Sequence, residues 1–478
     1  MHILHLIERL TLGGPLFATT GLVRNSRTAP GGHHRLVSLL RADTRAIEIA
    51  KQAGIEVLTA PSHGEVDTLI AQADIVQVHF WNSPAIHALL NRRLPACRLL
   101  VWCHVNGAHT PHVIPVALAR QAARVATTTA MTLDLPQFQA LRREEPSRLV
   151  AVPGGADFSR LAGFEPQSHD GFRVGFVGRV DASKVHPDFV AMCARVAVPL
   201  LHVVVRGDGQ YKVQLQQQVA ASDVPHRFSF EGHAEDIRHA LADLDVLGYP
   251  LHPETFCTSE LVVQEAMYAG IPCVLLAHGG PARLVTSGRN GIVARTTDEY
   301  VAAIESLARR PEWRQQLGQQ ASADARATLG APVTSSRMDA VYDELMQLSK
   351  QELTPVANFR ALGNAPLETT GAQAFIASLD GRRDTDLRIS LSGGNDDAAL
   401  HAEQRLATCG PAMQDVILQY RMFYPEDRWL RLWSALALAS RKRWALAAGE
   451  LLMAKKMGCS RRVDSHMARL RREQSEHA

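Results

Sequence analysis

The sequence lacks a hydrophobic run long enough to cross a membrane. No apolar stretch reaches the roughly 18 residues that a membrane-spanning helix requires. The N-terminal segment MHILHLIERL is interrupted by Glu8 and Arg9, and no small-residue cleavage site follows it. We therefore expect neither a spanning helix nor a signal peptide, and we interpret this segment as a first buried strand.

Cysteine and net charge are also scarce. The 7 cysteines are scattered and form no Cys-x-x-Cys pair, and Cys193 and Cys273 lie in apolar segments. Buried thiols of this kind suit a reducing compartment, so we expect a cytoplasmic protein. The formal net charge of +3 argues against a nucleic-acid partner, but it permits anionic ligands or a peripheral position at the inner membrane face.

Short apolar runs alternate with helical patterns over most of the chain. This alternation restarts after the polar stretch 164–171, and it is typical of parallel sheets that are covered by helices on both faces. We predict an α/β protein with two tandem doubly wound domains, residues 1–165 and 166–350. The candidate strands are 3–7, 36–40, 55–59, 75–80, 99–104, 125–128 and 149–152, then 174–177, 201–205, 228–230, 246–249, 273–276 and 292–294.

The chain changes character after about Lys350. Residues 351–395 contain Pro355, Pro366 and a Ser-Gly-Gly-Asn run, which predict a linker. Residues 396–478 have helical spacing and predict a mainly helical domain. Because this region follows both α/β domains, we expect a chain that ends near Lys350 to stay folded.

The helical end combines basic and aromatic residues. Two interpretations remain open: a solvated face over a small core, or a contact with a membrane surface or a protein. The residues concerned are Arg441, Lys442, Arg443, Lys455, Lys456, Arg461 and Arg462, with Trp429, Trp433 and Trp444.

A first chemical motif follows the apolar run 174–177. Gly178 and Arg179 come directly after it, and Lys184 stands five residues beyond Arg179. Loops at the carboxyl ends of parallel strands face the ligand crevice of such a sheet. A glycine there lets the backbone approach a ligand, and the two cations would neutralise a diphosphate.

A second motif surrounds the helical pattern 261–269, which Gly270 ends. We expect Thr258 or Ser259 to cap this helix, whose first N–H groups and dipole favour phosphate oxygens. Glu265 lies further along the helix, where its carboxylate would accept both hydroxyls of a ribose.

These motifs resemble retaining glycosyltransferases of the GT-B fold, in particular glycosyltransferase family 4. The resemblance covers residues 1–345 in order. It implies two Rossmann-like domains, a donor site formed by Gly178, Arg179, Lys184, Thr258, Ser259, Leu261, Glu265, Gly279 and Gly280, and an acceptor-side loop at Gly13 and Gly14. The matching segments are Glu265-Ala-Met-Tyr-Ala-Gly-Ile-Pro272, His278-Gly-Gly-Pro281, Asn290-Gly-Ile-Val293, Val152-Pro-Gly-Gly-Ala-Asp157 and Gly13-Gly14.

The sequence departs from the family pattern at a glutamate. The position eight residues before Glu265 is Cys257, and Glu254 and Glu260 are the available substitutes. We favour Glu260 because it stands at the helix start. Arg283 occupies a position where the family commonly has a glutamate. The resemblance also implies that His104, after the run 99–103, points at the donor sugar.

No cofactor is expected. His104, His109 and His112 have poor spacing for a zinc site, and the two Asp-x-Asp strings, 243–245 and 384–386, are better explained as turns. Arg179, Lys184 and the helix start would stabilise the departing diphosphate without a metal.

The predicted function is transfer of a hexose from a nucleoside diphosphate sugar to an acceptor hydroxyl, with retention, in glycan or glycoconjugate synthesis. A carbohydrate, a lipid-linked molecule or a protein would be the acceptor, and the sequence identifies neither the donor base nor the sugar. The alternatives are a nucleotide-sugar epimerase of the same fold, or a non-catalytic nucleotide-sugar-binding scaffold whose helical end binds a partner.

Overall fold

The computed structural model of the chain describes residues 1–27, 33–355, 370–392 and 396–476. Two compact units are present. The first unit consists of residues 1–79, 97–108 and 123–350, and the second consists of 80–96, 109–122 and 351–478. Within the described ranges, no helix has both the length and the hydrophobicity needed to cross a membrane.

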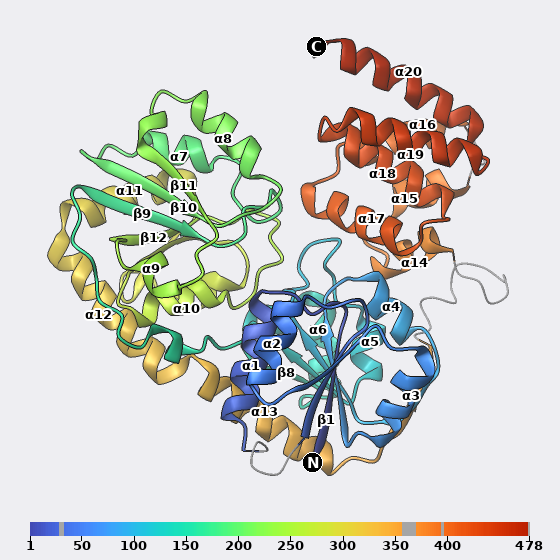
Figure 1. Ribbon diagram of the computed structural model, residues 1–478, viewed down its shortest axis with the longest axis horizontal. Coiled ribbons are helices and arrows are strands. Elements are labelled where there is room, and N and C mark those ends of the chain that lie inside the picture. The colour runs from blue at the N-terminus through green and yellow to red at the C-terminus, as the bar shows by residue number, and fades with distance from the viewer. Residues whose placement is uncertain (28–32, 356–369, 393–395, 477–478) are drawn as a thin grey trace. The chain divides into compact units, whose positions relative to one another are not determined.

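The N-terminal lobe of the first unit, mostly blue and cyan in Figure 1, contains a parallel sheet. This sheet has seven strands in the order β3-β2-β1-β4-β6-β7-β8. Strand β1 pairs with β2 and β4, β2 pairs with β3, and β7 pairs with β6 and β8, all in parallel. Strands β1, β4 and β6 are almost completely buried, which explains their nearly continuous apolar sequences. The strands are β1 (His2–Ile7), β2 (His33–Ser38), β3 (Glu56–Thr59), β4 (Ile75–Phe80), β6 (Leu99–Cys103), β7 (Arg124–Thr127) and β8 (Leu149–Ala151).

Helices cover this sheet, and one of them comes from far along the chain. Helix α13 (Ala331–Met346) packs against α1 (Gly14–Asn25). The Ser26 hydroxyl donates a hydrogen bond of 2.5 Å to Asp339 of α13, and Tyr342 donates one of 2.6 Å to Gln77. The other helices of the lobe are α2 (Thr44–Gln52), α3 (His63–Gln72) and α6 (Pro136–Glu144).

The second lobe contains a six-stranded sheet with the order β11-β10-β9-β12-β13-β14. Strand β9 lies between β10 and β12, so the chain changes direction across the sheet at this point, and a crevice for ligands is expected beside the carboxyl ends of β9 and β12. Both sheets confirm the predicted α/β architecture. The strands are β9 (Phe172–Val177), β10 (Leu201–Arg206), β11 (Phe228–Gly232), β12 (Val246–Tyr249), β13 (Cys273–Leu276) and β14 (Gly291–Ala294).

The helices of this lobe separate its strands in sequence. Helix α10 follows β12 and carries the predicted donor motif. The helices are α7 (Phe189–Arg195), α8 (Lys212–Ala220), α9 (Ile237–Leu241), α10 (Leu261–Tyr268), α11 (Thr297–Arg309) and α12 (Pro311–Thr328).

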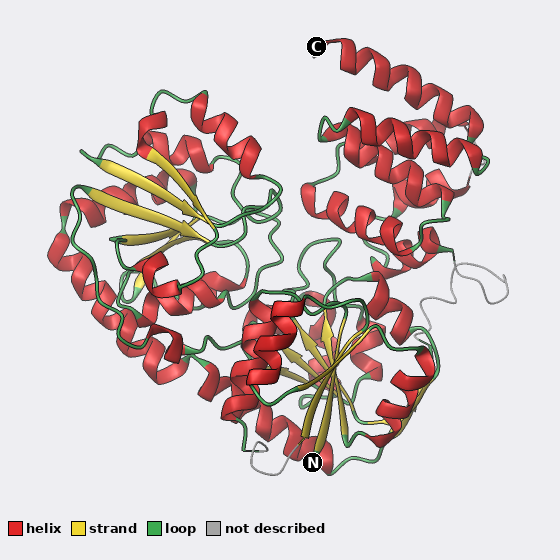
Figure 2. Cartoon of the chain, viewed as in Figure 1, coloured by secondary structure: helices red, strands yellow, loops and turns green. Residues whose placement is uncertain are grey.

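The second unit is mostly helical, as Figure 2 shows for residues 371–476. Strand β5 pairs with β15, and α14 and α17 pack against α4. The elements are α4 (Pro84–Leu90), β5 (Leu94–Cys97), α5 (Val116–Gln121), β15 (Gln351–Leu353), α14 (Gly371–Ser378), α15 (Thr385–Ser392), α16 (Asp396–Ala407), α17 (Pro411–Phe423), α18 (Arg428–Ser440), α19 (Trp444–Lys456) and α20 (Ser460–Glu476).

The predicted boundaries differ from this organisation in two ways. Segment 351–395 is not simply a linker, because it forms β15, α14 and α15; its residues 356–369 and 393–395 lie outside the described residues. The N-terminal domain is also not one continuous stretch, since 80–96 and 109–122 belong to the second unit. The reason is long-range bonding that local patterns do not reveal.

Asn82 is the clearest example of that bonding. Its amide nitrogen donates to Ser378 Oγ at 3.0 Å, and its carbonyl oxygen accepts from the Tyr420 hydroxyl at 3.1 Å. All three side chains are fully buried. A buried polar group needs such partners, so the pairing of these distant segments is specific.

Several basic residues of the helical end form internal ion pairs. Arg441 pairs with Asp415 at 2.8 Å and Lys455 with Asp464 at 2.5 Å. Arg462 is buried and pairs with Glu403 at 2.8 Å. Trp433 is also buried, and its indole N–H donates to Ser390. For these residues the structure favours the interpretation of a charged face over a helical core.

Candidate active site

Gly178 begins the loop after β9 in a conformation that suits glycine. Its φ is 142°, and a Cβ atom there would lie 3.2 Å from the Tyr249 hydroxyl and 3.6 Å from Lys184 Nζ. Both the backbone conformation and the close contacts therefore favour a residue without a side chain. The loop is held next to a polar cluster that sequence reasoning did not fully anticipate.

Lys184, Glu260 and Tyr249 form this cluster. Lys184 Nζ donates to Glu260 Oε2 at 2.8 Å, and the Tyr249 hydroxyl donates to the same oxygen at 2.8 Å. The side chains of Lys184 and Glu260 are only 14% and 17% exposed. The structure thus brings together the predicted lysine and the favoured glutamate, which lie 76 residues apart.

The electrostatics of the cluster keep this pair ionised. Burial lowers the pKa of Lys184, but the charge of Glu260, together with the smaller effects of Tyr249, Cys257 and the hydrogen bond to Glu260, outweighs burial, and the pKa of Lys184 rises well above its usual value. Burial raises the pKa of Glu260, but Lys184 and the hydrogen bonds to the carboxylate lower that pKa overall. A buried lysine and a buried carboxylate are compatible here because each compensates the other.

Arg179 differs from Lys184 in its surroundings. Its side chain is 76% exposed, and its guanidinium lies 2.7 Å from Asp181. An exposed pair of this kind contributes little to stability, so Arg179 retains freedom to contact a ligand. The two predicted cations are therefore a fixed lysine and an adaptable arginine.

The start of α10 corrects the predicted capping. Glu260, with φ 12°, occupies the cap position, and no side chain caps the helix there. Ser259 instead donates to the carbonyl of Gly154 at 3.1 Å, and Gln264 donates to the same carbonyl at 2.7 Å. Thr258 is buried. The prediction that Thr258 or Ser259 caps the helix is wrong, because the Ser259 hydroxyl donates to the distant carbonyl of Gly154 instead.

The paired glycines pack closely against this turn. A Cβ atom on Gly280 would lie 2.4 Å from the carbonyl oxygen of Thr258, and Gly279 has a φ of 66°. Any larger residue at 280 would displace the backbone that leads into α10. Gly280 therefore lies beside Thr258, and Gly279 lies beside Thr255 and Cys257, while the role of the two glycines in donor binding stays a prediction.

Glu265 is buried and already has a cationic partner. Arg160, from the 3-10 turn η2 (Phe158–Leu161), lies 3.1 Å from its carboxylate. Burial raises the pKa of Glu265 to about 7, although Arg160 acts in the opposite direction. Sequence reasoning missed Arg160 because no local motif marks it. The role of Glu265 toward ribose hydroxyls stays a prediction.

The N-terminal lobe contributes Gly13, Gly14 and His104. Cβ atoms on Gly13 and Gly14 would meet nothing within 4 Å, so this loop leaves room for a ligand. His104 follows β6 and shares a hydrogen bond of 2.9 Å with His79. Burial lowers the pKa of His104 to about 3, so its ring is neutral. The predicted roles of these residues are untested by the geometry alone.

Asn106 ties the loop of His104 to the loop before α10. Its amide nitrogen donates to the carbonyls of Thr255 at 2.7 Å and Cys257 at 3.1 Å. The backbone N–H of Asn106 also donates to Phe256 O at 3.1 Å. No sequence signal singled out Asn106, because its partners lie about 150 residues further along the chain.

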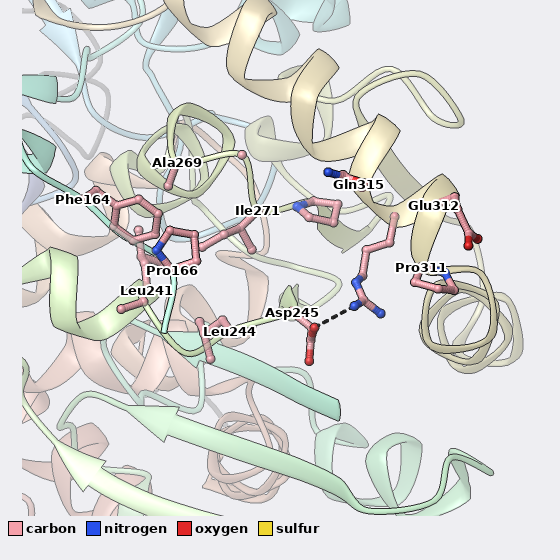
Figure 3. Close-up of a pocket in the computed structure, with 14 residues that line it drawn as sticks. Phe164, Pro166, Leu241, Leu244, Asp245, Ala269, Ile271, Pro311, Glu312 and Gln315 are labelled. Atoms are coloured by element: carbon pink, nitrogen blue, oxygen red, sulfur yellow. Dashed lines mark ion pairs between the residues drawn. The ribbon is translucent and has the colours of Figure 1, made fainter. Parts of the chain in front are cut away.

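A pocket of about 420 Å³ lies at the amino ends of strands in the second sheet (Figure 3). Its lining includes Leu244 and Asp245, just before β12, and Ile271 and Pro272, just before β13. Asp245 pairs there with Arg314 at 2.9 Å. The amino ends of the strands form this pocket, whereas the donor motifs follow the carboxyl ends, so the pocket is separate from the candidate active site.

A metal site is not evident in the described parts of the chain. No group of three or more His, Cys, Asp or Glu side chains in those ranges is arranged to hold an ion. Asp243 instead pairs with Arg206 at 2.6 Å, and Asp386 with Arg405 at 2.6 Å. The expectation of metal-independent chemistry stays a prediction.

The comparison with known protein families gives a match that lies in the second lobe. Residues 161–324 match the family model described as "Glycosyl transferases group 1". This range contains Gly178, Lys184, Glu260 and Glu265. The family match therefore coincides with the lobe whose polar cluster is described above.

Two characterised relatives align over parts of the chain. The GDP-mannose-dependent alpha-mannosyltransferase of Mycolicibacterium smegmatis is 37% identical over 120 residues, which are 25% of this chain and 29% of that protein. The 2-deoxystreptamine N-acetyl-D-glucosaminyltransferase of Streptomyces fradiae is 32% identical over 211 residues, 39% of this chain and 49% of that protein. The chain thus spans less than half the length of either relative.

A solved structure covers more of the fold. The Anabaena protein Alr3699/HepE in complex with UDP has a TM-score of 0.58 and 17% identity, over 72% of this chain and 100% of that one. At this identity the likeness shows architecture. The first unit of the chain has the GT-B fold, two parallel-sheet domains, and the chain carries an added helical region.

Proposed function

We propose that the protein is a glycosyltransferase that moves a hexose from a nucleoside diphosphate sugar to an acceptor hydroxyl. The observation that carries this proposal is the largely buried Lys184–Glu260 pair, which follows the carboxyl ends of β9 and β12 in a lobe that matches a glycosyltransferase family model. Resemblance to glycosyltransferase family 4 supports retention of the anomeric configuration as part of the proposal.

Lys184 is the principal group for the departing diphosphate. Its ammonium has three donors, and one donates to Glu260, so the lysine is oriented before a ligand binds. Arg179 is exposed and would approach the same charge from solvent. Fixed cations lower the barrier most where negative charge develops in the transition state.

The start of α10 supplies further donors. No side chain caps this helix, so its first N–H groups suit phosphate oxygens. Thr258, Ser259, Leu261, Gly279 and Gly280 would surround the donor. No metal is needed in this mechanism, because Lys184, Arg179 and the helix start act on the same developing charge.

The sugar and the acceptor are assigned by class. The two relatives described above carry mannosyltransferase and N-acetyl-glucosaminyltransferase names, which supports a hexose donor. Gly13 and Gly14 would line the acceptor side, and the acceptor would be a carbohydrate, a lipid-linked molecule or a protein.

The seven cysteines are free thiols, which supports a cytoplasmic location. A peripheral contact through the helical unit is part of the proposal.

A donor panel tests the function. The full chain would be mixed with nucleoside diphosphate sugars that vary in base and sugar, and its melting temperature would be measured. A donor that binds only the folded state raises apparent stability in proportion to the logarithm of its concentration over Kd. We expect one base and one hexose to give the largest shift.

Mass spectrometry of the products then separates the alternatives. Release of nucleoside diphosphate with a glycosylated acceptor or free hexose supports transfer. An isomerised nucleotide sugar with no released diphosphate would instead identify an epimerase. Binding without any product, over a broad acceptor panel, would support the scaffold alternative and contradict the proposed activity.

A further inference from the structure

Four histidines, three of them buried and His104 partly exposed, form a continuous hydrogen-bonded chain across the N-terminal sheet. They lie on or directly after the adjacent strands β2, β1, β4 and β6. His34 Nδ1 is 2.9 Å from His5 Nε2, His5 Nδ1 is 3.1 Å from His79 Nε2, and His79 Nδ1 is 2.9 Å from His104 Nε2. This series of hydrogen bonds, called the histidine chain below, therefore ends at His104, the residue that we propose to lie beside the donor sugar.

Every link uses one Nδ1 and one Nε2. The His79 and His104 ring planes differ by only 3°, which suits a bond from an N–H to the in-plane lone pair of the facing nitrogen. His5 and His79 are completely buried, and His34 is 5% exposed. The geometry indicates bonds between imidazoles rather than loose packing of rings.

The four rings are neutral. Burial lowers the pKa values of His5 and His79 well below 6.5. Burial also lowers the pKa of His34 to about 4 and that of His104 to about 3. A neutral imidazole has one N–H and one acceptor nitrogen, so each ring donates at one end and accepts at the other.

Only two proton arrangements satisfy all three bonds. Either every ring carries its proton on Nδ1, or every ring carries it on Nε2. A mixture would place two N–H groups, or two lone pairs, against each other in at least one link, and an unsatisfied buried polar group is costly. The tautomers of the four histidines are therefore coupled.

We propose that His34, His5 and His79 are positioning residues that fix the tautomer of His104. If all protons are on Nε2, His104 Nδ1 is an acceptor, and if all are on Nδ1, it is a donor. The chain thus decides whether His104 Nδ1 accepts a hydrogen bond from a hydroxyl or donates one to it. This role at the donor sugar rests on the proposed function, whereas the coupling itself does not.

Asp339 acts on the His34 end of the histidine chain. The charge of Asp339 acts on His34 and raises its pKa against the dominant effect of burial. Asp339 is itself fixed, since it accepts from the Ser26 hydroxyl at 2.5 Å and from the backbone N–H of Arg27 at 2.8 Å. The two proton arrangements orient the N–H dipoles in opposite directions. The fixed charge of Asp339 therefore stabilises one arrangement relative to the other.

Nitrogen NMR on the full chain tests this proposal directly. Histidine labelled with ¹⁵N shows, by its couplings to ring carbon-bound protons, which ring nitrogen is protonated. We expect His5, His34, His79 and His104 to share one tautomer at neutral pH. Mixed tautomers among them would overturn the proposal, and this measurement needs no substitution.

A substitution at the far end then tests the coupling. His34→Asn keeps a polar group facing His5, but an amide offers either an N–H or an oxygen, so the constraint on the chain is released. We expect the tautomer ratio of His104 to change. The control His2→Gln alters an exposed ring on β1, the strand of His5, that stacks on His33 and takes no part in the histidine chain. An unchanged His104 in folded His34→Asn would contradict the proposal.

Kinetics separate this inference from the proposed function. For the donor found by the panel, His34→Asn should lower kcat several-fold with little change in the affinity for the free nucleoside diphosphate, while His2→Gln should change neither. If no donor is turned over, the proposed function fails, but the tautomer measurements still decide the coupling. A rate unchanged in His34→Asn despite an altered His104 tautomer would overturn the positioning role.

Discussion

The two parallel-sheet lobes share a strand order but bury their titratable groups in opposite ways. The second lobe holds the ionised pair Lys184 and Glu260, and it places Arg160 against the carboxyl group of Glu265. The N-terminal lobe holds imidazoles that burial keeps neutral, such as His5 and His79. Burial penalises a charge unless a partner compensates it, so Lys184 and Glu260 stay ionised as a pair, whereas His5 and His79, which face other imidazoles, stay neutral.

The lobes also differ in how much of their chain they keep. The second lobe, 158–330, lies entirely within the first unit. The N-terminal lobe contributes 80–96 and 109–122 to the second unit, where Asn82 bonds to Ser378 and Tyr420. One lobe is therefore closed on itself, while the segments that follow β4 and β6 depend on the C-terminal helices.

The largest expected effect is on this dependence. Removing residues 351–478 takes away Ser378 and Tyr420, which bond to Asn82, and the helices α14 and α17, which pack against α4, contrary to the expectation that such a chain stays fully folded. Hydrogen exchange should show the opening free energy of amides in 80–96 and 109–122 falling toward roughly 0 kcal/mol, while β9 to β14 stay protected. Equal protection of all segments would show that the two lobes do not differ in this respect.

The next effect concerns the ionised pair. Lys184→Met should slow transfer roughly 100- to 1000-fold, because it removes a fixed cation, and should lower the free energy of unfolding by about 3–5 kcal/mol, because Glu260 loses its partner. The double variant with Glu260→Gln should recover stability but not transfer. Kinetics and chemical denaturation measure the two quantities separately.

Arg179→Ala is the matched control for that variant. Arg179 is exposed, so its removal should change stability by only about 0.5 kcal/mol while still slowing transfer. A stability loss in Arg179→Ala as large as in Lys184→Met would contradict the distinction between a fixed and an adaptable cation.

A smaller effect follows from Glu265. Its pKa is raised to about 7, so the folded protein holds a proton that the unfolded chain has released. This stabilisation is complete below about pH 4.5 and is lost as pH rises toward 7, by about 3 kcal/mol. Glu265→Gln should lack that slope. Unfolding curves at several pH values measure the difference, and parallel pH profiles of the two proteins would contradict it.

The smallest expected effect is none at all. Since the pKa values of His104 and His34 fall to about 3 and 4, neither ring should take up a proton between about pH 5.5 and 8. Proton NMR follows the ring signals, with free histidine in the same sample as a reference. Titration of His104 in that range would contradict the contrast between neutral imidazoles in the N-terminal lobe and the ionised Lys184–Glu260 pair in the second lobe.

The sequence predicted the local elements that carry the donor motifs, because the signals for these elements come from neighbouring residues. An apolar run before Gly178, a helix ended by Gly270 and paired glycines at 279 and 280 each follow from a few neighbouring residues. The α/β alternation similarly identified both sheets. Local backbone preference and hydrophobic period determine such features before any long-range contact forms.

Only the tertiary structure decided which groups meet. Ser259 donates to the carbonyl of Gly154 instead of capping the helix, and Arg160 pairs with Glu265 although no local sequence signal marks it. The histidine chain likewise requires four strands in one register, although its members are scattered from His5 to His104. Composition and spacing fix the secondary structure, whereas burial and hydrogen-bond satisfaction depend on the partners that folding supplies, and these determine charge and tautomer.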